Sequence, residues 1–340
     1  MQLWPVTPSG WWKRLAVVGI STLALWWVLR RVDLAELARV ASHLRWGWFA
    51  AAMMMFGLAV AFATARWDLM LRLGHCAVHP VATLRAVLIG HFFNTLFFGP
   101  AGGDVAKSML YSRWYGHAAT EVMATCALDR LLGGGGLLLF IVLGLGATAS
   151  SGATTVVETW GEAARAHWLL VVLVLALTAL GLWRLQTTTR DSPVKRTYAA
   201  FRQHGAQLLA SRWLTAQGLL LGLLSQAAGS AVLALCLQAV STAALSWAQL
   251  LWAFPLIALS AAVPSVSGAG VRDGAALLLL GSCGIPAADA VAASLLTLVV
   301  YLCWFGIGGV LWWVEERRLR SRPLAAAQGP HVETTHGSRD

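Results

Sequence analysis

The chain has 340 residues, of which 58% are hydrophobic and only 12% are charged, and its mean hydropathy is +0.67. A soluble globular protein carries roughly 25% charged residues, so this composition excludes a soluble domain of this size. The net charge of +10 is distributed between apolar segments and not in one basic run, which argues against a nucleic-acid-binding chain and is typical of membrane proteins. The sequence predicts an all-α polytopic membrane protein.

Metal and cofactor chemistry find little support in the sequence. The five cysteines are scattered without a C-x-x-C pair, and His75 and His79, four residues apart, have no carboxylate group nearby. No P-loop, Ser-His-Asp arrangement or pair of catalytic carboxylates is recognisable. We therefore expect no disulfide framework, no metal, no cofactor, no ATP-driven step and no enzymatic activity from this chain.

Apolar segments follow one another along the sequence. A full helical span needs about 20 residues. Some of the segments are too short for this, or run into Pro and Gly, and these are expected to form helical hairpins. The first segment follows Lys13 and Arg14 and has no small-residue cleavage site, so we predict an uncleaved span. The segments are 15–29, 46–65, 81–98, 118–147, 167–186, 213–240, 248–263, 274–283 and 286–314.

The charges between these segments predict their orientation. The basic 184–212 connection and the arginines of 317–322 are expected in the cytoplasm, together with the N-terminus, and the acidic 148–166 connection outside. These positions are consistent only if 81–117 and 248–283 are re-entrant hairpins that enter from opposite sides. The 30–45 connection then lies outside, where we expect an amphipathic surface helix.

This topology divides the chain into two halves of opposite orientation, about 10–160 and 161–316. Each half has three spans and one re-entrant helical hairpin, which gives about eight apolar helical segments in total. Such inverted repeats are found in many secondary transporters. We expect residues 1–320 to form a single transmembrane domain, with a cytoplasmic loop at 187–211 and a disordered cytoplasmic tail at 321–340.

The first motif with the potential to bind a ligand is NTLFFGPAGGDVAK, which begins at Asn94 and contains Gly102 and Gly103. Broken backbone inside a membrane is tolerated only where protein or a water-filled cavity satisfies it. Asp104 is expected to cap the returning helix, and Lys107 follows one turn later, so this helix start suits an anion such as a phosphate. The alternative is a surface loop, with Asp104 a plain N-cap and Lys107 extended toward the interface.

The second motif is PSVSGAGVRDG, which occupies the equivalent place in the second half. It contains Ser265, Gly268 and Gly270, whose small size lets a ligand approach the backbone. The charged pair Arg272 and Asp273 follows. The alternative is a hairpin in which this pair only forms an internal contact.

A third feature is Asp129-Arg130, inside the long 118–147 segment. A charge at the centre of a span costs roughly 2.5–3.5 kcal/mol on the insertion scale, so such residues are expected to be paired or functional. The alternative is that Arg130 is a structural partner of Asp104 or Asp129.

Taken together, N-x-x-F-x-G-P-A-G-G-D-x-x-K, L-D-R-L-L-G and P-S-x-S-G-A-G-V-R-D-G resemble the transmembrane domain of lysylphosphatidylglycerol synthases, over about residues 10–316. That domain also occurs alone in flippase-like membrane proteins of bacteria. The chain departs from the family at Lys107, where Arg is frequent, and at Asp273, where Glu is frequent. The resemblance implies lipid translocation between leaflets, here without the soluble aminoacyl-transferase domain that makes the lipid.

We therefore expect a protein of the bacterial cytoplasmic membrane that translocates an anionic, aminoacylated or polyprenyl-phosphate-linked lipid. The alternatives are a permease for a small anion and a non-transporting membrane partner of a lipid-modifying enzyme. The expected partners are lipids with anionic head groups, and no nucleic acid. In this hypothesis Lys107, Arg130 and Arg272 hold the phosphate, while Asp104, Asp129 and Asp273 orient those cations or contact an amine of the head group. The other candidate binding residues are Asn94, Ser265 and the glycines of the two hairpins, Gly102, Gly103, Gly268 and Gly270.

The orientation predicts which side of the membrane each connection occupies. In a chain with its native cysteines replaced, a cysteine beside Glu158 should react with an impermeant reagent added outside, and a cysteine beside Lys195 only after the membrane is opened. The reason is the opposite charge of the two connections. Labelling of both from the same side would contradict the two-halves topology.

Overall fold

The computed structural model of the chain describes residues 42–96, 100–150, 192–242, 247–260 and 270–321, together with Trp26 and Ala35. These residues form helices joined by short connections, with no strand among them. Several predicted elements lie wholly or mostly outside the described residues: the 15–29 span, the 30–45 helix, the 148–166 connection, the 167–186 span and the 321–340 tail.

Four of the helices contain stretches that are long and apolar enough to cross a membrane: Trp46–Leu73, Ala119–Gly144, Arg212–Val240 and Ala287–Arg318. The all-helical, multi-pass architecture expected from composition is confirmed at this level. The helices of the described residues are α3 (Trp46–Leu73), α4 (Pro80–Leu96), α5 (Pro100–Tyr115), α6 (Ala119–Ser150), α8 (Pro193–Ala210), α9 (Arg212–Val240), α10 (Trp247–Ser260), α11 (Val271–Ser282) and α12 (Ala287–Ser321).

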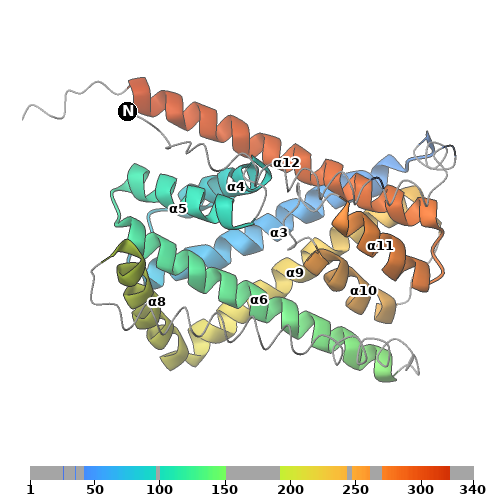
Figure 1. Cartoon of the computed structure of the whole chain (residues 1–340), viewed down its shortest axis with the longest axis horizontal. Coiled ribbons are helices and arrows are strands. Elements are labelled where there is room, and N and C mark those ends of the chain that lie inside the picture. The colour runs from blue at the N-terminus through green and yellow to red at the C-terminus, as the bar shows by residue number, and fades with distance from the viewer. Residues whose placement is uncertain are drawn as a thin grey trace, which may run out of the picture.

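The order of long and short helices occurs twice. A long helix, two short helices and a second long helix form α3 to α6, and the same order recurs from α9 to α12 (Figure 1). The helices α3 and α9 pack side by side and run in opposite directions, since the backbone N–H of Arg45, before α3, donates to the carbonyl of Ala239 near the end of α9 (2.9 Å). The contacts across the halves are reciprocal, because α12 packs on α4 and α6 packs on α10.

The two pairs of short helices lie toward opposite ends of the molecule (Figure 1). The pair α4 and α5 joins the end of α3 to the start of α6, and Arg113 of α5 pairs with Glu316 near the end of α12 (3.9 Å). The pair α10 and α11 joins the end of α9 to the start of α12. The tips of the two pairs, 97–99 and 261–269, lie outside the described residues. Each pair is therefore anchored at both of its outer ends to long helices.

The predicted cytoplasmic loop at 187–211 is wrong in its conformation, because most of it forms the helix α8. The Ser192 hydroxyl accepts a hydrogen bond from the Lys195 backbone N–H (3.2 Å), and Pro193 occupies the first helical position, so the sequence carries a regular helix start. Ala200, His204 and Leu208 recur every four residues and are buried where α8 packs on α6. The prediction rested only on the charges of this segment and overlooked its helical periodicity.

A glycine contact brings α6 and α9 close together. A β-carbon at Gly222 would lie 2.6 Å from the carbonyl oxygen of Leu132 and 3.4 Å from the Cα of Gly136. A β-carbon at Gly136 would overlap the backbone of Gly222. Small residues on both sides let the backbones approach, which is how helices associate where lipid removes the hydrophobic driving force.

Replacing Gly222 with Ala should therefore destabilise the protein. The added methyl group has no space, and overpacking of this kind costs about 1–3 kcal/mol, although Ala is the better helix former. The matched control is Gly229→Ala on the same helix, where a β-carbon meets nothing within 4 Å. Thermal unfolding in detergent should give a lower Tm for Gly222→Ala and an unchanged or higher Tm for Gly229→Ala. Equal Tm values for the two variants would refute the close contact.

Candidate functional site

Charged side chains from three helices gather around a small cavity between α3, α4, α5 and α6. The cavity measures about 60 Å³, close to the volume of two water molecules in the liquid. It can hold one small polar group but not a whole lipid. The charged residues that line it are Arg66 of α3, Asp104 and Lys107 of α5, and Asp129 and Arg130 of α6, with His91 and Asn94 contributed by α4.

Asp104 joins two cations in this cluster. Its carboxylate accepts hydrogen bonds from Nη2 and Nε of Arg130 at 2.7 and 2.5 Å, and Nζ of Lys107 lies 3.3 Å away. The prediction that Asp104 caps the helix is wrong, because α5 begins four residues earlier at Pro100. The alternative of a plain N-cap is wrong for the same reason. Its carboxylate is instead shared between two side chains.

Lys107 is buried although it carries an ammonium group, with 7% of its side chain exposed. Besides Asp104, it contacts the ring of Trp67, whose centroid lies 4.3 Å from Nζ. An aromatic face attracts a desolvated cation, so Trp67 contributes to holding the charge. The alternative in which Lys107 extends toward the interface does not fit this burial.

The start of α5 approaches α4 closely at two residues of the first motif. The backbone N–H of Gly103 donates to Oδ1 of Asn94 (2.9 Å), and a β-carbon at Gly103 would overlap Asn94 and the carbonyl of Gly90. Only glycine fits at this point. Gly102 precedes it in the first turn of α5 and is partly buried. The roles of Asn94 and Gly103 are therefore to join the two short helices beside the cavity.

Asp129 pairs with Arg66, a residue that the sequence reasoning missed. The Nε and Nη2 atoms of Arg66 lie 2.7 and 3.3 Å from the two carboxylate oxygens of Asp129, and 7% and 5% of the two side chains are exposed. Nη1 of Arg66 also donates to the hydroxyl of Ser225 on α9 (3.3 Å). The predicted span at 46–65 ended one residue before Arg66, whereas α3 continues to Leu73. The position of Arg66 directly after an apolar run was the signal in the sequence that could have identified it.

The cluster has more positive than negative charge. Arg66, Lys107 and Arg130 face only two carboxylates, and Arg66 satisfies one of these carboxylates by itself. Arg130 is the accessible cation of the group, because 49% of its side chain is exposed against 7% for Arg66 and Lys107. A guanidinium group that is reachable from outside and adjoins a second cation is suited to an anion with two oxygens.

Arg272 and Asp273 lie in a separate buried cluster on α11 and α12. Arg272 is 2% exposed and donates from Nε to the Ser294 hydroxyl (3.1 Å) and from Nη2 to the Ser294 carbonyl (2.9 Å). Asp273 is fully buried and accepts from the Ser294 hydroxyl (2.5 Å), from Nη2 of Arg272 (3.4 Å) and from the backbone N–H of Gly270 (2.9 Å). Gly270 precedes α11 with a φ of +80°, a conformation that glycine adopts without strain.

The structure therefore does not unite the predicted phosphate-binding residues in one place. Lys107 and Arg130 line the charged cavity, whereas Arg272 does not line it and binds Ser294 instead. Its contact with Asp273 is the internal pair that was the alternative interpretation of the second motif. Ser294 was missed because a serine in an apolar run carries no distinctive signal. Ser265 and Gly268 lie outside the described residues.

Comparison with known proteins identifies a family. The family model for the "Lysylphosphatidylglycerol synthase TM region" matches residues 14–308, most of the chain. No curated protein matches the chain.

The buried pair between α3 and α6 makes a stability prediction. Arg66→Leu leaves Asp129 buried without its partner, and breaking a buried ion pair on one side costs about 3–5 kcal/mol. We expect a large loss of folded protein in detergent, measured by size-exclusion chromatography and thermal unfolding. The matched control is Arg130→Gln, whose side chain is half exposed, and it should fold as the unaltered protein does.

The double variant Arg66→Leu with Asp129→Leu tests whether the unpaired charge of Asp129 causes the instability of Arg66→Leu. It removes both charges, and it should recover much of the folded yield because no unpaired carboxylate remains. A double variant as unstable as Arg66→Leu would mean that the packing of the arginine side chain, and not the charge of Asp129, is responsible.

Proposed function

The chain belongs to the lysylphosphatidylglycerol synthase TM region family, whose members are membrane proteins linked to lipid modification or translocation, and we propose that it translocates a phosphate-bearing lipid between leaflets. The lipid is anionic, aminoacylated or linked to a polyprenyl phosphate. Its head-group phosphate occupies the cavity that Arg130 and Lys107 line, while its acyl chains stay in hydrocarbon.

The observation that carries this proposal is the surplus cation at the cavity. Asp104 is the shared partner of Arg130 and Lys107, so one carboxylate faces two positive groups. A phosphate supplies the missing negative charge and offers two oxygens to the guanidinium fork of Arg130. The volume of about 60 Å³ fits a single head-group moiety. Asn94 and Gly103 support the site by holding α4 against α5.

In the proposed transport, the two halves of the chain move relative to each other. The repeated order of helices, the opposite directions of α3 and α9 and the reciprocal contacts of α12 with α4 and of α6 with α10 support an inverted repeat. In such transporters one half rocks against the other around a fixed site, which then faces each side in turn. The short helix pairs α4–α5 and α10–α11 would act as the two re-entrant hairpins.

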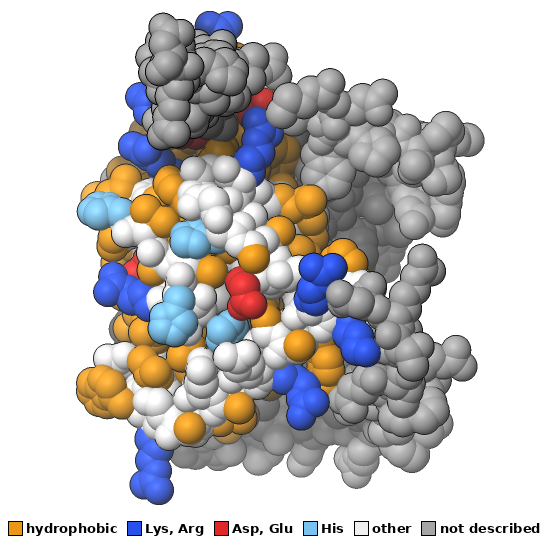
Figure 2. All heavy atoms as spheres, turned by 90° about the vertical axis from the view of Figure 1, so that its left-hand side faces the viewer, with side chains coloured by type: hydrophobic (Ala, Val, Ile, Leu, Met, Phe, Trp, Pro, Cys, Tyr) orange, Lys and Arg blue, Asp and Glu red, His pale blue; other side chains and the backbone are white. Residues whose placement is uncertain are grey.

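The orientation follows from charge. Figure 2 views the end of the molecule that carries α8, where Lys and Arg side chains gather along the edges of the face. The segment 192–213 contains Lys195, Arg196, Arg202 and Arg212 and no acidic residue. The positive-inside rule then favours a cytoplasmic location for this end in a bacterial inner membrane, with both chain termini in the cytoplasm.

Arg130→Gln should slow lipid transfer strongly without preventing folding. A hydrogen bond to a charged group contributes about 1.5–3 kcal/mol, so loss of the fork should slow transfer about tenfold to a hundredfold. Arg130→Lys should recover only part of the rate, because a point charge cannot bind two oxygens at once. The measurement is the exchange of fluorescent phosphatidylglycerol between leaflets of proteoliposomes. Arg113→Gln, on α5 but paired with Glu316 away from the cavity, is the matched control.

A double variant tests whether Arg130 only neutralises its neighbour. In Arg130→Gln with Asp104→Asn both charges are removed, and a purely structural role predicts recovered transfer. The phosphate-binding role predicts that transfer stays low. Uptake of free phosphate by proteoliposomes that show no lipid exchange would instead favour a small-anion permease. Absence of lipid exchange in the unaltered protein, together with a cellular function that survives loss of both residues, would favour a non-transporting partner of a lipid-modifying enzyme.

A further inference from the structure

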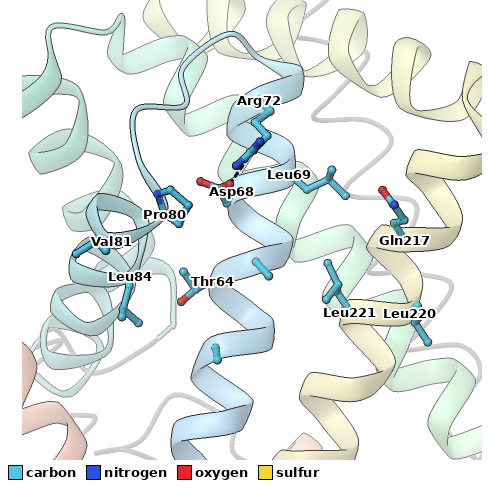
Figure 3. Close-up of a pocket in the computed structure, with 12 residues that line it drawn as sticks. Thr64, Asp68, Leu69, Arg72, Pro80, Val81, Leu84, Gln217, Leu220 and Leu221 are labelled. Carbon is cyan, nitrogen blue, oxygen red and sulfur yellow. Dashed lines mark hydrogen bonds and ion pairs between the residues drawn. The ribbon is translucent and has the colours of Figure 1, made fainter.

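A second and much larger cavity, of about 670 Å³, lies on another face of α3. It is bounded by α3, the start of α4 and the first turns of α9 (Figure 3). Ala61, Ala65, Asp68 and Arg72 lie on one face of α3 at helical spacing and line this cavity, whereas Arg66, on a different face, lines the charged cavity described above. The two cavities are therefore separate spaces on either side of the contact between α3 and α4.

The walls of this groove are mostly alkyl groups. Leu69 of α3, Leu84 of α4 and Leu221 of α9 point into the space between the three helices (Figure 3). The outer rim is open, because Val81 is 46% exposed and Leu220 is 54% exposed. In a protein that crosses a membrane, an open alkyl groove on the outside of the helices faces hydrocarbon and not water.

Charge is confined to one end of the groove. Asp68 is buried and accepts hydrogen bonds from the Thr83 hydroxyl (2.9 Å) and from Nε of Arg72 (2.8 Å). The side chain of Arg72 remains 63% exposed and occupies the last turn of α3. The groove thus has a cation at its mouth and alkyl side chains below it, which complements the anionic phosphate and the acyl chains of a phospholipid.

The length of the groove matches one leaflet. Its α3 wall extends from Arg72 to Ala61, eleven positions that cover about 16 Å at the helical rise of 1.5 Å. The hydrocarbon core of a bilayer is about 30 Å thick, so one leaflet contributes about 15 Å. A lipid whose phosphate lies at Arg72 would therefore have its chain end near the membrane midplane at Ala61.

We propose that this groove binds one phospholipid of the leaflet at the α8 end, with its phosphate on Arg72 and an acyl chain along Leu69, Leu84 and Leu220. The proposal rests on the proposed function and adds the place where the lipid waits before its head group enters the charged cavity. The two spaces are neighbours along α4, because Leu84 lines the groove and Val87, one turn later, lines the cavity. The Thr83–Asp68 hydrogen bond holds α4 to α3 at the boundary between them.

Photo-crosslinking in nanodiscs tests the groove. The probe is phosphatidylglycerol with a diazirine on its acyl chain, present as a minor component in phosphatidylcholine, and the labelled peptides are identified by mass spectrometry. Peptides that contain Leu84 and Leu220 should be labelled several-fold more than the exposed outer face of α6 at Leu138, which is 65% exposed. Leu220→Trp fills the rim of the groove and should remove most of this excess. Leu138→Trp, an equal change at an exposed leucine elsewhere, should leave it unchanged.

Two substitutions test the role of Arg72. Arg72→Gln should lower the labelling of the groove by phosphatidylglycerol several-fold, and Arg72→Lys should retain most of it, because the charge is kept. Labelling spread evenly over all lipid-facing helices, or an excess that persists in Leu220→Trp, would overturn the proposal. A groove that stays unlabelled because a second copy or another protein covers it would overturn it as well.

Failure of this proposal can be told apart from failure of the proposed function. If the groove holds a lipid but the protein does not translocate it, labelling will follow Leu220 and Arg72 while no variant alters leaflet exchange. If the protein translocates lipid by another entry route, exchange will depend on Arg130 while the groove shows no excess labelling. If both proposals hold, Leu220→Trp will slow exchange and leave the fold, measured by its Tm, unchanged.

Discussion

The cost of burying charge in an apolar helix bundle governs the first half of this structure. Arg66 and Asp129 lie on two long helices that both contain membrane-crossing stretches, and neither side chain is more than 7% exposed. Each is acceptable there only because the other is within hydrogen-bonding distance. Their pairing fixes α3 against α6. Because Asp129 is fully engaged by Arg66, the neighbouring Arg130 is left to Asp104 and the cavity.

Close helix packing makes this pairing possible. Gly136 and Gly222 let α6 approach α9, and a β-carbon at Gly133 would lie 2.7 Å from Nη1 of Arg66. The guanidinium group therefore occupies space that a side chain on α6 would otherwise fill. The same principle operates between α4 and α5, where Gly103 brings its backbone N–H to Asn94. In both places glycine provides room for a polar contact that would be costly to leave unmade in hydrocarbon.

The two halves use different means to hold their short helices. In the first half, charged groups from α3, α5 and α6 face a common cavity, and one of them is half exposed. In the second half, Arg272, Asp273 and Ser294 bind one another and are buried, although Nη1 of Arg272 has no hydrogen-bond partner among the described residues. Although the helix order is repeated, only the first cluster offers an accessible cation. The repeated helix order thus accommodates a charged cluster with a half-exposed cation in one half and a buried charged cluster in the other.

The sequence by itself determined the membrane class, the helical architecture, the approximate bounds of most described helices but not of α8, and the charged residues worth examining. These follow from hydropathy and from the cost of charge in hydrocarbon, which depend on composition along the chain. The sequence offered Asp104 and Asp129 as alternative partners of Arg130 without a means to choose between them, and Arg66 was missed altogether. That choice depends on which residue of another helix lies opposite, 63 positions away in the case of Arg66 and Asp129. Likewise, the burial of Arg272 against Ser294 and the groove below Arg72 arise from packing between distant segments, so only the tertiary structure decided them.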